Sequence, residues 1–142
     1  MPPELAGKRL IRRIFIHCSD TPEGDVDSIR KYHIGQGWKD IGYHYVVLKN
    51  GVIEAGRPEE EGGAHVQGEN YDSLGVCLIG KDGLYTVVQL RSAVYLVNEL
   101  LNKYKLSWPS VYGHYQAPSA KVQGKSCPDF DISFFRSLLR RD

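Results

Sequence analysis

The stretch that decides the fold class is Leu74-Gly75-Val76-Cys77-Leu78-Ile79, an almost continuous apolar run near the middle of the chain. A strand with one solvated face alternates apolar and polar residues, whereas a strand covered on both faces is apolar throughout. We therefore expect a buried central strand over 74–79. Helices should pack on both faces of the sheet that contains it.

Other strand patterns lie on both sides of this run. Residues 10–17, Leu-Ile-Arg-Arg-Ile-Phe-Ile-His, are rich in β-branched and aromatic side chains. Residues 43–49 and 52–54 flank an Asn-Gly pair, which is typical of a tight hairpin. A short run over 111–114 predicts a last strand.

Helix signals alternate with these strands. A short helix is expected over 27–35, and the longest begins at the capping box Thr86-x-x-Gln89 and runs to about residue 105. A final helix is capped by Asp131. The stretch from Gly56 to Tyr71 and the Gly/Pro/Ser/Lys-rich segment before Cys127 are predicted loops. Hairpin strands and interspersed helices together predict an α/β fold with a single mixed central β-sheet flanked by helices.

Length and composition limit the possible functions. The chain has 142 residues and a net charge of +1, which suits one domain over 1–142, with 1–9 a loose N-terminal segment, and gives no general reason to expect nucleic acid as a partner. No apolar run approaches the roughly 20 residues of a membrane span, and the N-terminus lacks the pattern of a signal peptide. We expect a cytoplasmic protein without a membrane segment. Its three scattered cysteines form a poor disulfide framework, so free thiols or a thiolate ligand are expected.

Three residues could form a metal site. His17 and His114 each end a predicted strand, and Cys127 lies in a loop just before a helix. Two imidazoles and one thiolate make a zinc set with one open position, as in catalytic sites. The spacing is not diagnostic, because HExxH and CxxC signatures are absent, and the pattern by itself favours buried structural histidines and an inert cysteine.

The remaining histidines and cysteines have structural interpretations. Cys18 should point to the face of its strand opposite His17, and Cys77 should be a small buried hydrophobe. His44 should face away from its neighbour Tyr43 and serve packing. His33 lies on a predicted helix and is expected to be a packing or surface residue.

Five separated motifs carry a family resemblance, and they follow one another over roughly residues 10 to 140. They are Ile16-His17-Cys18-Ser19, Gly37-Trp38-x-x-x-Gly42-Tyr43-His44, Gly51-x-x-Glu54-Ala55-Gly56-Arg57, Gly75-Val76-Cys77-Leu78-Ile79-Gly80 and Lys125-x-Cys127-Pro128. This set closely resembles the zinc-dependent N-acetylmuramoyl-L-alanine amidases. The match is closest to the amidase-type lysozymes (endolysins) of phages, with peptidoglycan recognition proteins as more distant relatives.

The resemblance implies a role for each matching residue. His17, His114 and Cys127 would hold one zinc ion (Zn2+), and Tyr43 and Lys125 would be the catalytic residues. The zinc would activate water and polarise the amide carbonyl. Lys125 would stabilise the oxyanion, and Tyr43 would orient or deprotonate the water and pass a proton toward the leaving amine.

Two parts of the resemblance are less direct. In Gly63-Ala64-His65, with Asn70 nearby, the sequence resembles the family's groove wall, which implies substrate contact by His65 and Asn70. The segment between His114 and Cys127 is several residues longer than in the family, so Lys121 competes with Lys125. The intact Lys-x-Cys-Pro spacing favours Lys125.

The substrate also follows from the resemblance. We expect hydrolysis of the amide between N-acetylmuramic acid and L-alanine in bacterial peptidoglycan, by a monomeric phage or prophage endolysin that reaches the cell wall after holin-type release. A cytoplasmic amidase of cell-wall recycling and a non-catalytic peptidoglycan-binding module are alternatives; non-catalytic relatives commonly lose the cysteine ligand that Cys127 matches. A cysteine peptidase and a muramidase are less favoured. Phage lysozymes of this type can bind a phage RNA polymerase, which nothing in the sequence tests.

Overall fold

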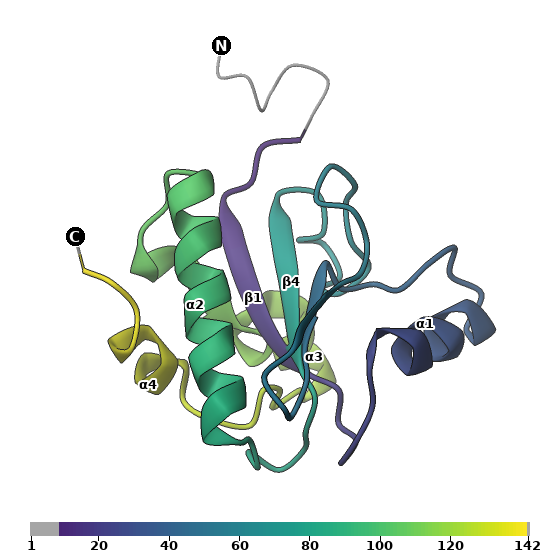
Figure 1. Ribbon diagram of the computed structural model, residues 1–142. Coiled ribbons are helices and arrows are strands. Elements are labelled where there is room, and N and C mark those ends of the chain that lie inside the picture. The colour runs from purple at the N-terminus through teal and green to yellow at the C-terminus, as the bar shows by residue number, and fades with distance from the viewer. Residues whose placement is uncertain (1–8, 142) are drawn as a thin grey trace.

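The computed structural model describes residues 9–141, and within them one mixed sheet has the strand order β3-β2-β4-β1-β5 (Figure 1). The strands are β1 (Arg13–Cys18), β2 (Tyr45–Val47), β3 (Ile53–Ala55), β4 (Ser73–Leu78) and β5 (Val111–Gly113). The pairs β1–β4, β1–β5 and β2–β4 are parallel, and the hairpin β2–β3 is antiparallel. The apolar run over 74–79 thus forms the middle strand, and the predicted mixed sheet is confirmed.

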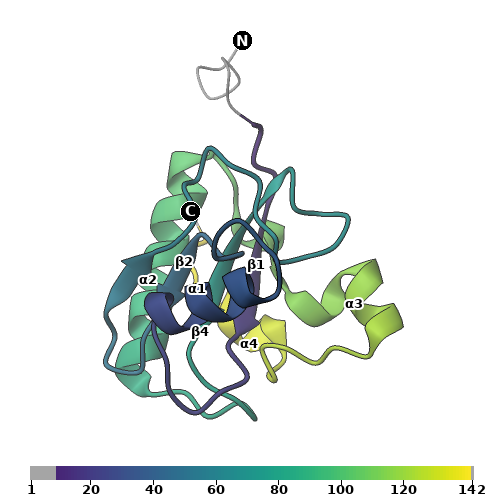
Figure 2. The same cartoon turned by 90° about the vertical axis from the view of Figure 1, so that its right-hand side faces the viewer.

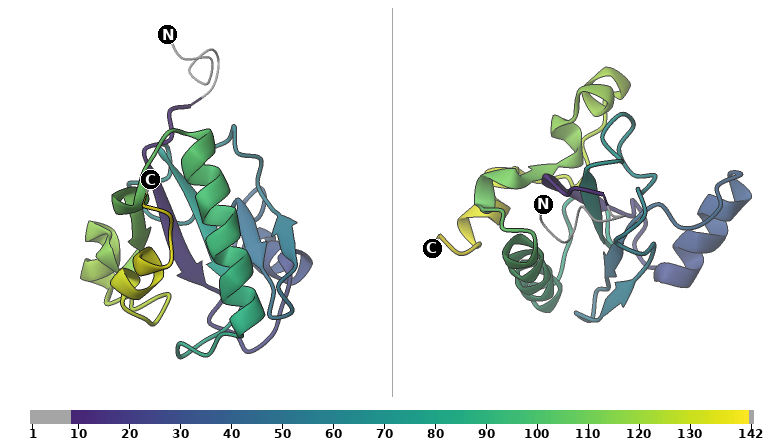
Figure 3. Two further views of the ribbon diagram at one scale, coloured as in Figure 1. Left: turned by 60° about the vertical axis from the view of Figure 1, so that its left-hand side comes forward. Right: turned by 90° about the horizontal axis from the view of Figure 1, so that it is seen from above.

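Helices cover both faces of this sheet. They are α1 (Val26–Gly35), α2 (Val87–Lys103), α3 (Pro118–Gln123) and α4 (Ile132–Ser137), with 3-10 turns at Trp108–Ser110 and His114–Gln116. Figures 2 and 3 show α2 and α1 on opposite sides of the sheet, with α3 set apart beside one edge. Over residues 9–141, no helix combines the length and the apolar character that crossing a membrane requires.

The face under α2 and α4 holds the main core. Every second residue of β1 and β4 points into it, including Ile14, Ile16 and Val76, which are fully buried. The predicted capping box of α2 is present, because Thr86 and Gln89 bond each other's backbone N–H groups. The buried Gln89 amide also donates to the carbonyl oxygens of Val47 and Ile79, which ties α2 to β2 and to the end of β4.

The alternate residues of the same strands point to the opposite face. In the β1–β4 register, Phe15 lies beside Gly75 and His17 lies beside Cys77. Cys77 packs in a cluster with residues of α1, whereas Phe15 packs with residues of α3. His17 is therefore the one imidazole that β1 directs toward the face covered by α1 and α3.

The structure differs from the predictions in the segment before Cys127, which contains α3 and is not entirely loop. Pro118 occupies the first turn of α3, Ala120 is buried, and Gly124 ends the helix in the left-handed conformation with φ 70°. A helix of six residues is too short for its periodicity to be recognised in sequence.

Two further differences concern strand and domain ends. β2 begins at Tyr45, so Tyr43 and His44 precede it and strict alternation does not apply to them. The predicted loose segment over 1–9 lies outside the described residues except for Arg9. That residue is 6% exposed, and its guanidinium donates to the backbone carbonyls of Glu59, Tyr71 and Ser73.

Candidate active site

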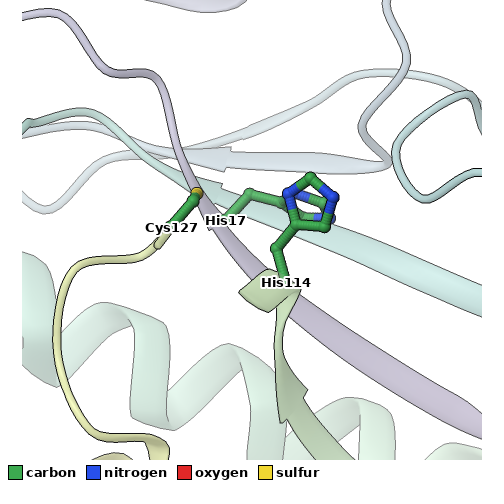
Figure 4. A group of neighbouring side chains, drawn as sticks. All are labelled: His17, His114 and Cys127. Atoms are coloured by element: carbon green, nitrogen blue, oxygen red, sulfur yellow. The ribbon is translucent and has the colours of Figure 1, made fainter. Parts of the chain in front are cut away.

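Three predicted metal ligands converge at one edge of the sheet. His17 is the next-to-last residue of β1, and His114 directly follows β5, the parallel neighbour of β1. Parallel strands end at the same edge, so these two imidazoles are brought side by side, with ring centroids 4.5 Å apart. Cys127 arrives from the loop between α3 and α4 (Figure 4). One ligand atom from each of the three residues lies within 4.8 Å of the other two.

The chemistry of this donor set fits a zinc ion. Burial lowers the pKa of His17 well below its usual value, and burial and the charge of Lys125 lower that of His114 to about 4. Both imidazoles are therefore neutral at pH 7, the form that binds metal. A hydrogen bond with the Cys18 side chain and burial raise the pKa of the Cys127 thiol, so a thiolate there requires a nearby cation. Two nitrogens and one sulfur leave one position of a tetrahedral zinc open.

A cavity of about 360 Å³ opens beside these ligands. His114 and Cys127 line it together with Tyr43 and Lys125. Its rim also carries carboxylates that the sequence did not single out, because nothing in their spacing connects them: Asp20, Asp82 and Asp129. A small polar group that enters the cavity would meet the ligands and both predicted catalytic side chains.

The Tyr43 ring lies against the first predicted ligand, with its centroid 5.0 Å from that of His17. On its other side it packs against His33, at 5.5 Å between centroids, and His33 Nδ1 accepts a hydrogen bond from the backbone N–H of Gly42. His33 is thus a packing residue that supports the Tyr43 segment. Burial raises the pKa of Tyr43 well above its usual value, so its phenol is protonated and can donate a hydrogen bond.

Comparisons with known proteins identify the family of this chain. A family model described as N-acetylmuramoyl-L-alanine amidase matches residues 7–130. The chain belongs to the N-acetylmuramoyl-L-alanine amidase family.

Relatives of this amidase include phage and animal proteins. The endolysin of Enterobacteria phage T3 is 40% identical over 129 residues, which cover 84% of this chain and 81% of the relative. The N-acetylmuramoyl-L-alanine amidase LysC from Clostridium intestinale has a TM-score of 0.81 at 26% identity, covering 93% of this chain and 87% of that one. A mutant of the Drosophila peptidoglycan recognition protein LB, in complex with tracheal cytotoxin, has a TM-score of 0.72 at 25% identity, covering 85% and 76%. These findings confirm the resemblance to both groups and the predicted fold class.

The two lysines that compete for one role lie in different places in this amidase. Lys125 follows the end of α3 and lines the cavity, and its charge lowers the pKa of His114. Lys121 lies within α3, is exposed and does not line the cavity. Only Lys125 is positioned to reach a group held beside the ligands.

His65 and Asn70 do not line the cavity. His65 is 8% exposed, and its Nδ1 lies 2.9 Å from Nε2 of His17. The Asn70 side-chain oxygen accepts from the backbone N–H groups of His65 and Val66, both at 2.8 Å. Asn70 thus shapes the loop and His65 contacts a predicted ligand, while substrate contact by either residue stays a prediction.

The other cysteines and His44 complete the surroundings. Cys77 is fully buried, and Cys18 is 6% exposed, as predicted for core residues. Cys18 nevertheless reaches the cavity rim, because β1 ends there, and its Sγ lies 3.8 Å from a carboxylate oxygen of Asp129. His44 is 1% exposed and has the predicted packing role: its Nδ1 accepts a hydrogen bond from the backbone N–H of Gly75, and unlike Tyr43 it does not line the cavity.

Proposed function

We propose that this amidase holds one zinc ion between His17, His114 and Cys127 and uses Tyr43 and Lys125 in catalysis. Its reaction is hydrolysis of the amide that joins N-acetylmuramic acid to L-alanine in bacterial peptidoglycan. The observation that carries the proposal is the convergence of the three proposed ligand atoms within 4.8 Å, beside a cavity that His114 and Cys127 line together with Tyr43 and Lys125.

The chemistry divides between the metal and the chain. Zinc, when bound, polarises the amide carbonyl and lowers the pKa of bound water from 15.7 to about 7. The Lys125 ammonium would stabilise the negative charge that develops on the carbonyl oxygen as water adds. The protonated Tyr43 hydroxyl would donate a hydrogen bond to the attacking water or to the departing nitrogen, and it can pass a proton between them.

The surroundings of the cysteine oppose a cysteine peptidase. A nucleophilic cysteine needs a lowered pKa, which positive neighbours supply. A hydrogen bond with Cys18 and burial instead raise the pKa of Cys127. A bound cation would lower this pKa by its own charge, so the thiol suits the role of a metal ligand better than that of a metal-free nucleophile.

We also propose that the protein acts as an endolysin that reaches the wall after holin-type release. The support is that the relatives from phage T3 and phage T7 are endolysins, at 40% and 38% identity. A host amidase of cell-wall recycling would share the reaction but act on soluble fragments.

The test is digestion of purified cell wall by the protein, with and without a chelator and with zinc restored afterwards. We expect new N-terminal alanine amines, loss of activity with the chelator and recovery with zinc. New reducing sugar ends, or full activity after complete zinc removal, would contradict the proposal. Intact wall and isolated muropeptides assayed in parallel would separate an endolysin from a recycling enzyme.

A further inference from the structure

Two buried imidazoles are in direct contact behind the proposed metal site. Nε2 of His17 lies 2.9 Å from Nδ1 of His65, and their rings meet edge to face at 84°. The other ring nitrogen of His65, Nε2, lies 3.3 Å from the Ser73 hydroxyl oxygen. These three side chains form a hydrogen-bonded series that starts at the proposed metal ligand His17 and ends at Ser73 on β4.

The hydrogen bonds of Ser73 determine which ring nitrogens of His65 and His17 carry a proton. The Ser73 hydroxyl donates to the backbone carbonyl of Glu69 at 2.6 Å, so its single proton is committed there. Its oxygen must therefore accept from Nε2–H of His65. A neutral imidazole carries one N–H, and burial disfavours the charged form, so Nδ1 of His65 is an acceptor. His17 then donates from Nε2, and its Nδ1 is the one ring nitrogen with a free lone pair.

The protein is shaped around the His65 ring. A Cβ atom on Gly75 would lie 2.7 Å from Cγ of His65, and a Cβ atom on Gly63 would lie 2.5 Å from Cδ2 of the same ring. Real Cβ atoms essentially never approach so closely, so these two glycines leave the space that the imidazole fills. The Asn70 side chain also holds the His65 backbone N–H. Both the ring and its backbone are fixed in place.

We propose that His65 is a positioning residue: it accepts the Nε2 proton of His17 and donates its own to Ser73, which locks His17 in the tautomer that binds metal through Nδ1. The proposal rests on the zinc site of the proposed function. Outer hydrogen-bond partners of ligating histidines fix the tautomer and the ring orientation, and their loss typically weakens metal binding by about 10- to 100-fold.

The first test needs no metal. Two-bond ¹H–¹⁵N correlation spectra of the metal-free protein report which ring nitrogen of each histidine is protonated. We expect His17 and His65 both as Nε2–H tautomers, and we expect Ser73→Ala to leave His65 exchanging between tautomers. A His17 ring protonated at Nδ1 would overturn the proposal.

The second test measures zinc affinity by competition with a chromogenic chelator. His65→Leu should weaken zinc binding by about 10- to 100-fold. His65→Asn should restore most of the affinity, because its amide can accept from His17. Gln89→Leu is the control, since it removes a buried hydrogen-bonding side chain on the opposite face of the sheet, and its zinc affinity should equal that of the wild type.

The outcomes separate this proposal from the one it rests on. A wild-type protein that binds no zinc would contradict the proposed function. A wild type that binds zinc, with His65→Leu binding equally well, would overturn only the role of His65. A raised KM for cell-wall fragments with unchanged zinc affinity would instead assign His65 to substrate contact.

Discussion

The backbone N–H of Cys18 donates a hydrogen bond to Sγ of Cys127, at 2.6 Å, across 109 positions of the chain. The contact joins the last residue of β1 to the loop before α4 and brings the third proposed ligand beside the first. The amide lowers the pKa of the Cys127 thiol, but the Cys18 side chain and burial raise it by more, so a bound cation is needed for the thiolate that binds metal. The sheet edge therefore positions all three proposed ligands.

Replacing the sulfur ligand should remove the metal. For Cys127→Ser we expect zinc affinity to fall by more than about 100-fold, because losing a ligand costs more than losing an outer-shell partner. Metal analysis after dialysis and circular dichroism would check binding and folding. Full zinc content in the variant would show that Cys127 is not a ligand.

Replacing the cavity lysine should affect turnover and leave the metal in place. Lys125→Met should lower kcat by about 100- to 1,000-fold, the usual cost of removing a group that stabilises an oxyanion. Lys121→Met is the matched control and should retain wild-type kcat, because Lys121 is exposed on α3 outside the cavity. A low kcat in Lys121→Met with wild-type kcat in Lys125→Met would assign the catalytic role to Lys121.

Removing the Tyr43 hydroxyl should also lower kcat while zinc stays bound. Tyr43→Phe keeps the ring that packs against His17 and His33, so folding and zinc content should be unchanged. We expect kcat to fall by about 100-fold or more, the range for loss of a general acid or base. Wild-type kcat in this variant would rule out a catalytic role for the hydroxyl.

Acid should destabilise the metal-free fold through buried histidines. Burial lowers the pKa of His44 from 6.5 to about 4, and the side chain is 1% exposed. The unfolded chain therefore binds more protons between these values, so the free energy of unfolding should fall as pH decreases from 6.5 to 4. The contribution of His44 is about 3 kcal/mol.

The control for this effect is His44→Asn, whose side-chain oxygen can accept the Gly75 N–H that His44 Nδ1 now accepts. Urea denaturation in the presence of a chelator at several pH values would give both slopes. The variant should depend less on pH over this window, and equal slopes would refute the assignment.

The buried amide of α2 should matter for stability. Gln89→Leu removes the donor to the carbonyls of Val47 and Ile79, and we expect a loss of about 2 kcal/mol in the free energy of unfolding. Arg91→Ala, at an exposed position of the same helix, should cost far less. Thermal or urea denaturation compares the two directly.

Local pattern was sufficient for most of the fold. The apolar run over 74–79 predicted a strand covered on both faces, and the Thr86–Gln89 capping box marked the start of α2. Both signals were readable because the hydrophobic pattern of a strand and the capping of a helix involve only a few neighbouring residues. The six-residue α3 was not predicted, because a helix this short shows no recognisable hydrophobic periodicity and is stabilised by tertiary packing, here the burial of Ala120.

For the candidate site, too, the sequence predicted one part and the tertiary structure decided the other. Residue types and ordered motifs identified His17, His114 and Cys127 as candidates, but spacing alone could not exclude buried structural residues. Only the tertiary structure brings His65 against His17, 48 positions away, a contact that no pattern in the sequence predicts. The physical reason is strand pairing. The β1–β4 register places Gly75 beside Phe15, which lies two residues before His17 on the same face of the sheet. Because Gly75 has no side chain, His65 can occupy the space next to it.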